Sequence, residues 1–320
     1  MTWPEHGRWP HGSEASCPGP LTDLLFRSRA FRSDVKHALV IEGGGMKAAF
    51  ANGVLTAFEQ ARHRPFSGVY GTSAGGALAA WFSAGQAGFA EGTWRYARDP
   101  RFLSIRRALL GRGPFLDHEL LLDQVYVAEH PLDVEAVRRA PWPVVVTAAD
   151  VDTGECVYQD IRGHDVLSWL KATGRLPFAS GPPVEIGGRR FVDGGVLDPI
   201  PVRRAIDDGA DRVTLILNKP VERRKADSRF VLEMASRRYP ALRDGIVQHH
   251  AIKAHAIAFA LDPPDGVRVD VIRPPSDTGV SRMSRDMDRI RRAVSWGRDA
   301  GRRHVDAPFS PGNPASPAIL

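Results

Sequence analysis

Two short apolar runs near the start of the chain each end in a glycine-rich turn that leads into a helical pattern. Residues 37–42 are followed by three glycines, and apolar side chains then recur at helical spacing over residues 46–62. Residues 66–70 lead into Gly-Thr-Ser-Ala-Gly, and an alanine-rich apolar stretch follows over residues 74–87. The order strand, helix, strand, helix predicts a parallel α/β sheet.

The rest of the chain extends this pattern. Strand-like apolar runs lie at residues 142–149, 156–159, 212–217 and 267–272. Helical patterns lie at residues 114–128, 166–172, 201–208 and 283–303. Residues 184–192 predict a hairpin, because Gly187 and Gly188 suit a tight two-residue turn.

Composition and length are those of a globular chain. We expect a loosely ordered leader at residues 1–34, an α/β domain at 35–218, a basic and mostly helical extension packed on it at 219–305, and a disordered tail at 306–320. No apolar run reaches the roughly 20 residues that cross a bilayer. The chain has two cysteines, and its first residues lack the apolar core of a signal peptide. These features favour a cytoplasmic location.

Positive charge is concentrated in the C-terminal third. Residues 219–304 hold 19 Lys and Arg against 11 Asp and Glu, whereas the preceding part is almost balanced. Such a surface suits anionic lipid head groups. We therefore expect peripheral contact with an anionic membrane through this third, and we expect no nucleic acid partner.

Residues 71–75 match Gly-x-Ser-x-Gly, the pattern of a serine nucleophile on a sharp strand-to-helix turn. Small residues also line close helix packing, so the pentapeptide alone is weak evidence. Its position between a predicted buried strand and a predicted buried helix favours the nucleophile. Ser73 would then stand at a helix N-terminus, where peptide dipoles favour developing negative charge.

The glycines at 43–45 also follow a strand and open a helix. A dinucleotide-binding loop would need glycine at position 48, which is Ala48, and an acidic residue near the end of the next strand, which ends in Tyr70 instead. An oxyanion loop needs only free backbone N–H groups. Neighbouring parallel strands would place this loop beside Ser73 at the carboxyl edge of the sheet.

Asp193 stands just after the predicted hairpin, followed by Gly194 and Gly195. Asp-Gly is a turn signal, but the hairpin already has its turn. A carboxylate held by glycines can approach another backbone closely and accept the Ser73 proton. Lys171, Arg175 and the eleven histidines are other candidate bases, none in a comparable glycine frame.

Three motifs together resemble those of the patatin-like phospholipases: Gly-Gly-Gly-Met-Lys at 43–47, Gly-Thr-Ser-Ala-Gly at 71–75 and Asp-Gly-Gly at 193–195. The segments at 147–154 and 198–202 also resemble that family's pattern, so the resemblance extends over about residues 37–217. The basic third is similar to the extension of a bacterial, non-secreted subgroup.

The resemblance implies a three-layer α/β/α fold with a mainly parallel central sheet, and hydrolysis of phospholipid or lysophospholipid acyl esters through an acyl-enzyme. It implies Ser73 as nucleophile and Asp193 as general base, without a histidine, metal or cofactor. It also assigns backbone N–H groups of Gly44, Gly45 and Ala74 to the oxyanion hole. The remaining motif positions are Gly43, Lys47, Gly71, Gly75, Gly194 and Gly195.

One position departs from the family's pattern, which usually has glycine where this chain has Ala48. A methyl group is tolerated there if the residue is helical, and is damaging if the backbone needs positive φ.

Two alternatives stay open at this point. An α/β-hydrolase with a Ser, Asp, His triad would take its histidine from His249, His250 or His255, although these lie in a helical pattern. A catalytically weak lipid-binding protein could also retain the fold, and only Ala48 favours it.

Overall fold

A computed structural model describes residues 36–177, 179–220 and 237–307. The leader expected at residues 1–34 and most of the tail expected at 306–320 lie outside the described residues. Within the described ranges, no helix has both the length and the hydropathy needed to span a membrane.

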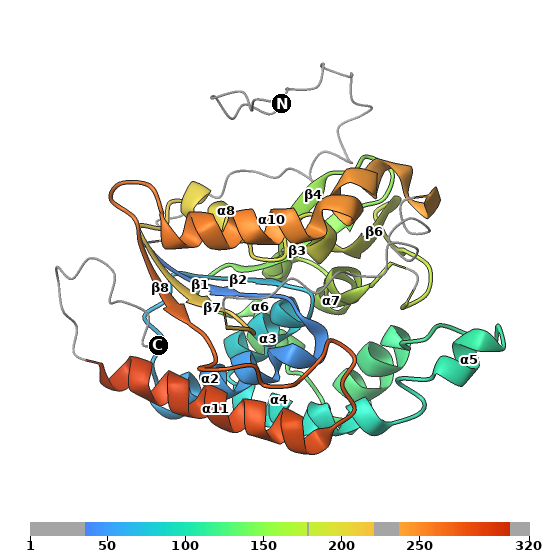
Figure 1. Cartoon of the computed structure of the whole chain (residues 1–320), viewed down its shortest axis with the longest axis horizontal. Coiled ribbons are helices and arrows are strands. Elements are labelled where there is room, and N and C mark those ends of the chain that lie inside the picture. Colours follow the sequence, from blue (N-terminus) through green and yellow to red (C-terminus); the bar gives the residue numbers. More distant parts are fainter. Residues whose placement is uncertain (1–35, 178, 221–236, 308–320) are drawn as a thin grey trace.

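In the described part of the chain, a central sheet of eight strands organises the fold, as the alternating pattern predicted (Figure 1). Along the main path the strand order is β5-β6-β3-β2-β1-β7-β8, and β4 also pairs with β3. The five parallel strands are β1 (His37–Ile41), β2 (Gly68–Thr72), β3 (Val144–Asp150), β7 (Arg212–Ile216) and β8 (Arg268–Ile272). The antiparallel strands are β4 (Cys156–Asp160), β5 (Val184–Ile186) and β6 (Arg189–Asp193).

Helices cover both faces of this sheet, which gives the predicted three layers (Figure 1). One face packs against the larger core, with α2 (Ala49–Gln60), α3 (Ala74–Ser83), α4 (Ala87–Ala90), α6 (Val134–Arg138), α7 (Val166–Gly174) and α11 (Met287–Asp306). The other face packs against α8 (Val202–Asp207) and α10 (Arg243–Leu261). Shorter helical segments are η1 (Gly45–Ala48), η2 (Glu91–Arg98), α5 (Ile105–Leu109), η3 (Leu120–Glu129), η4 (Ile161–Gly163), η5 (Gly194–Val196) and η6 (Pro240–Leu242).

The register of the parallel strands brings two turns together. Val40 pairs with Tyr70 and Ile41 with Gly71, so β1 and β2 end at the same edge of the sheet. The glycine loop follows β1 and the serine turn follows β2. Both therefore lie at the carboxyl edge, where open α/β sheets place their ligands.

The sheet continues past the boundary drawn at residue 218. β8 pairs in parallel with β7 over five residues, from Arg212 with Arg268 to Ile216 with Ile272. Helix α11 packs on α2 with the backbones in direct contact, because a side chain at Gly53 or Gly297 would overlap with the facing carbonyl group. The C-terminal part thus completes both the sheet and one helical layer.

Two predicted helices are shorter in the structure. The helix predicted at 114–128 begins only at Leu120. The residues before it form hydrogen bonds outside the helix, such as that from the Leu116 N–H to the Ala179 carbonyl at 2.8 Å. The helix predicted at 74–87 ends at Ser83, where Gly85 takes a positive φ of 74° and breaks the helical path.

Candidate active site

Ser73 occupies a strained turn between β2 and α3. Its φ and ψ are 57° and −129°, a backbone conformation that costs a residue with a side chain of the order of 1–3 kcal/mol. The flanking glycines make the turn sterically feasible. A Cβ at Gly71 would overlap with the Gly75 carbonyl, and a Cβ at Gly75 would lie 2.5 Å from the Ile41 oxygen. The predicted serine elbow is therefore present. Its flanking residues are glycines because the backbone segments approach too closely to leave room for a side chain.

Asp193 lies directly against this serine. The Ser73 Oγ donates a hydrogen bond to Asp193 Oδ2 at 2.6 Å, and the Gly195 N–H donates to Oδ1 at 2.8 Å. The Asp193 N–H donates to the Arg175 carbonyl at 2.8 Å, which fixes the backbone. Gly194 allows the end of β6 to lie close to β3, because a Cβ at this position would lie 2.6 Å from Thr147. The structure thus brings the two predicted residues into contact.

Asp193 is buried, with only 3% of the residue exposed. Burial raises its pKa from 3.8 to about 6, and the hydrogen bonds from Ser73 and Gly195 oppose this rise. A carboxylate that is harder to keep ionised binds a proton more strongly. Asp193 is thereby a better proton acceptor at neutral pH than an aspartate in water.

The glycine loop presents backbone donors beside Ser73. In the described part of the chain, the N–H groups of Gly44, Gly45 and Ala74 have no protein acceptor. The Gly43 N–H instead donates to the Pro199 carbonyl at 3.1 Å, which anchors the loop. Gly45 has a φ of 57°, and the next N–H, that of Met46, donates to the Arg282 carbonyl at 3.0 Å.

Ala48 is compatible with this loop. Its φ and ψ are −63° and −5°, in the right-handed helical region, and its side chain is fully buried. A methyl group in that conformation causes no backbone strain. The departure from the family's usual glycine therefore leaves the geometry of the loop intact.

An apolar pocket opens beside Ser73. It has about 870 Å³ of empty space, including its mouth, and Ser73, Gly45 and Ala74 form part of its wall. Most of the lining is apolar or aromatic, including Leu78, Trp81, Trp94, Phe102, Leu116, Leu122 and Met283. Among the described residues, His118 is the one histidine in the wall. Burial lowers its pKa to about 3, so its ring is neutral at ordinary pH. The pocket suits a hydrocarbon chain.

Cations stand at the same edge of the sheet. Arg282 lines the pocket. Burial lowers the pKa of Lys47 to about 7, with Lys219 and Arg282 adding to the effect. Lys253 contacts the buried Glu42 carboxylate. Of these cations, Arg282 brings positive charge to the pocket, close to the glycine loop.

The histidines of the triad alternative lie on α10, and His249 contacts the Arg282 guanidinium at 2.7 Å. A triad needs an imidazole between serine and acid, whereas the 2.6 Å contact joins Ser73 to Asp193 directly. The geometry therefore favours a two-residue arrangement.

Several residues that hold the site were not predicted from the sequence. Thr173 Oγ1 accepts a hydrogen bond from the Ser73 N–H at 2.9 Å. Thr147 donates to Thr72 at 2.7 Å, and Thr72 donates to the Asp198 carbonyl at 2.9 Å. Each of these contacts joins two residues that are at least 75 positions apart in the chain. No local sequence pattern could therefore predict them.

This arrangement defines a three-layer α/β protein with a serine elbow, a neighbouring glycine loop and a buried aspartate. The chain belongs to the patatin-like phospholipase family, whose sequence model matches residues 39–206. It is 27% identical over 287 residues to the uncharacterized protein YjjU of Escherichia coli strain K12, covering 83% of this chain and 76% of that protein. It is also similar to the crystal structure of VipD from Legionella pneumophila, with a TM-score of 0.43 and 13% identity over 86% of this chain and 67% of that one.

Proposed function

We propose that this protein is a serine acyl hydrolase that cleaves acyl esters of lipids with a Ser73–Asp193 dyad. The observation that carries the proposal is the 2.6 Å contact of the Ser73 hydroxyl with a buried carboxylate at the wall of an apolar pocket. Family membership supports the same class of reaction.

In the first half of the reaction, Asp193 accepts the Ser73 hydroxyl proton as Oγ attacks the ester carbonyl carbon. The carbonyl oxygen gains negative charge, and the N–H groups of Gly44, Gly45 and Ala74 would stabilise it. The tetrahedral intermediate then collapses. The bond to the leaving alcohol breaks, the alcohol takes the proton from Asp193, and the acyl group stays on Ser73.

In the second half, Asp193 accepts a proton from water as the water oxygen attacks the acyl carbon. The same N–H groups stabilise the second oxyanion. Collapse returns the proton from Asp193 to Ser73 Oγ and releases the fatty acid. Atoms and charge balance over the cycle, and it consumes one water and one ester.

The pocket supports a lipid substrate. Its apolar wall favours an acyl chain, and burial of each methylene contributes about 0.8 kcal/mol. Arg282 lines the pocket, and its exposed guanidinium favours the anionic head group of a phospholipid or lysophospholipid.

Labelling with a fluorophosphonate probe tests the proposal. We expect the wild-type protein to be labelled covalently at Ser73 and the Ser73→Ala variant to remain unlabelled. Asp193→Asn should remove nearly all turnover of a lipid ester, because the two residues act as one unit.

Two controls separate the alternatives. Replacing His249, His250 and His255 together with Gln should leave most of the turnover, whereas a triad enzyme would lose it. A folded wild-type protein that binds lipid but neither reacts with the probe nor hydrolyses any ester would instead be the catalytically weak lipid-binding protein.

A further inference from the structure

A short arm projects from the body of the protein and carries α5 at its tip (Figure 1). We define the arm as residues 103–116. Leu103 and Leu116 pair across its base, and the Ser104 N–H donates to the Phe115 carbonyl at 2.9 Å. The arm is thus a closed loop that leaves the body and returns to it at one point.

The tip of the arm exposes large apolar side chains. The exposed fractions are 67% for Ile105, 80% for Leu109 and 53% for Leu110. Single exposed apolar residues are ordinary, but three within six positions of one projecting element form an exposed apolar patch. Ile105 and Leu109 are one helical turn apart, so both lie on one side of α5.

The arm is held in this shape from within. The Arg107 guanidinium donates to the Pro114 carbonyl at 2.9 Å and to the Arg101 carbonyl at 2.6 Å. Ser104 Oγ accepts the Arg107 N–H at 3.2 Å and caps α5. These hydrogen bonds fix the shape of the arm, on which Leu109 and Leu110 are exposed.

The charge of the arm is of one sign. Residues 103–116 include Arg106, Arg107 and Arg112 and no Asp or Glu, and Arg101 stands two residues before them. Arg107 lies 3.7 Å from Asp117, and Arg101 pairs with Asp99 at 2.7 Å. Arg106 and Arg112 are exposed and form no ion pair with any described residue.

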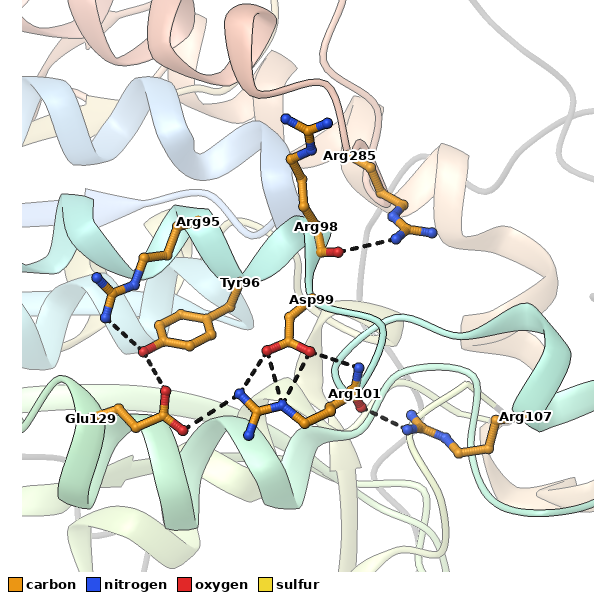
Figure 2. A network of polar contacts seen from close by, with 8 residues as sticks. All are labelled: Arg95, Tyr96, Arg98, Asp99, Arg101, Arg107, Glu129 and Arg285. Atoms are coloured by element: carbon orange, nitrogen blue, oxygen red, sulfur yellow. Dashed lines mark hydrogen bonds and ion pairs between the residues drawn. The ribbon is translucent and has the colours of Figure 1, made fainter.

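More arginines surround the base of the arm (Figure 2). Arg101 lies between Asp99 and Glu129, and the Arg285 guanidinium donates to the Arg98 carbonyl at 3.1 Å. Arg98 and Arg285 are exposed and have no carboxylate partner within the described ranges. The apolar tip is therefore bordered by cations both on the arm and at its base.

The arm is continuous with the wall of the apolar pocket. Phe102 immediately precedes it, Leu116 ends it, and both side chains line the pocket. A surface that received the tip of the arm would consequently lie near the pocket that contains Ser73.

We propose that the arm docks the protein on an anionic lipid bilayer, with Ile105, Leu109 and Leu110 inserted among the acyl chains and Arg106 and Arg112 at the phosphates. An amphipathic segment with apolar and cationic residues binds such an interface through both contributions. The docking does not depend on the proposed function, whereas transfer of a lipid from that bilayer into the pocket rests on it.

The observations favour a bilayer over a protein partner. A stable protein interface buries about 800 Å² on each side, usually with complementary charges. The tip offers two apolar side chains on a five-residue helix and a third at its C-cap, next to two arginines that form no ion pair within the described residues. Docking on a bilayer requires only such a small apolar insertion, because the anionic head groups also attract the arginines.

Vesicle sedimentation tests the apolar contribution. In a Ser73→Ala background, which excludes hydrolysis, we expect Leu109→Ser/Leu110→Ser to weaken partitioning onto phosphatidylcholine–phosphatidylglycerol vesicles by at least about tenfold. The matched control is Val247→Ser/Leu261→Ser, because these α10 residues are 55% and 57% exposed and lie away from the arm. The control should change partitioning by less than about twofold.

Charge reversal tests the electrostatic contribution. Arg106→Glu/Arg112→Glu should lower partitioning onto the anionic vesicles and leave the weak binding to pure phosphatidylcholine nearly unchanged. Raising the salt should weaken wild-type binding, because exposed charges are screened. Arg302→Glu/Arg303→Glu on α11 makes the same change of charge in the basic C-terminal third and should have the smaller effect.

Two outcomes would overturn the proposal. Serine substitutions at Leu109 and Leu110 that leave vesicle binding unchanged would exclude insertion of the arm. A wild-type dimer that dissociates on those substitutions, with vesicle binding unaffected, would make a second copy of the chain the occupant. Hydrolysis of a short water-soluble ester is measured in parallel with the same arm substitutions in a chain that keeps Ser73. It tests Ser73 independently and should equal that of the wild type.

Discussion

Thr173 and Ser73 are joined by a hydrogen bond from the Ser73 backbone N–H to the Thr173 Oγ1, at 2.9 Å. This contact occupies the N–H of the nucleophile itself, so that group is not available to an oxyanion. The next N–H along the chain, that of Ala74, remains free in the described structure. A side chain on α7 thus restricts which donor can serve at the elbow.

We expect Thr173→Val to slow turnover by about 10- to 100-fold with little change in KM, because it frees the Ser73 N–H and loosens the strained turn. Valine keeps the shape of this fully buried side chain. Thr173→Ser, which restores the acceptor, should recover most of the loss. Measuring kcat and KM for both variants checks this, and a Thr173→Val enzyme with unchanged kcat would remove Thr173 as a positioning residue.

Gly45→Ala and Gly44→Ala should differ sharply. Gly45 has positive φ, and a Cβ there would lie 2.5 Å from the Arg282 carbonyl oxygen. Gly44 has extended φ, and its Cβ would meet the Lys47 side chain at an ordinary 3.4 Å. We expect Gly45→Ala to cost at least the roughly 3 kcal/mol of one oxyanion donor, seen in kcat, and Gly44→Ala to cost less. Equal kinetics for the two variants would contradict this account of the loop.

The pH dependence of the reaction should follow Asp193. Since its pKa is about 6, the ionised form that accepts the Ser73 proton prevails above that value. We expect kcat/KM for a neutral ester to rise with pH through about 6 and then level off. A rise centred near pH 4 would mean that burial does not perturb this carboxylate.

The same shift predicts an effect on stability. The pKa of Asp193 rises from 3.8 in the unfolded chain to about 6 in the folded protein, so the ionised carboxylate costs the fold about 3 kcal/mol. This cost is absent below pH 4 and complete above about pH 7. Asp193→Asn should therefore raise the melting temperature at pH 8, and the difference should shrink at pH 4. Thermal unfolding at both pH values checks the sign.

Ala48→Gly should not activate the enzyme. Ala48 is already helical and its side chain is fully buried, so glycine would restore nothing in the loop. It would instead destabilise the helical segment by about 1 kcal/mol. Denaturant unfolding and kcat together test this expectation, and a gain in kcat would indicate that the methyl group constrains the loop after all.

Local patterns were enough to predict the layers, the elbow and the hairpin. Each depends on residues adjacent in the sequence, such as the apolar run before Gly43 or the glycines around Ser73. The pairing of Ser73 with Asp193 was also predicted, through the order of three motifs that resemble one family.

Long-range contacts could not be predicted in this way. The Met46 N–H meets the Arg282 carbonyl across more than 230 positions, and Thr173 meets Ser73 across 100. The arm at residues 103–116 was not predicted either, because exposure of Leu109 depends on what the fold leaves uncovered. The expected membrane contact through residues 219–304 stays a prediction.

The contact of the glycine loop with the Arg282 carbonyl limits where this chain can be cut or fused. The family's sequence model ends at residue 206, and every proposed catalytic group lies before it. Yet the loop is docked on a carbonyl from the far end of the chain, and the sheet is completed there by β8. A fragment ending near residue 218 would contain all of the proposed catalytic groups. It would lack the Arg282 carbonyl, which holds the glycine loop, and β8, which completes the sheet. We therefore expect an active fragment to include the chain through α11, and we expect a chain cut or fused at residue 206 or 218 to be inert.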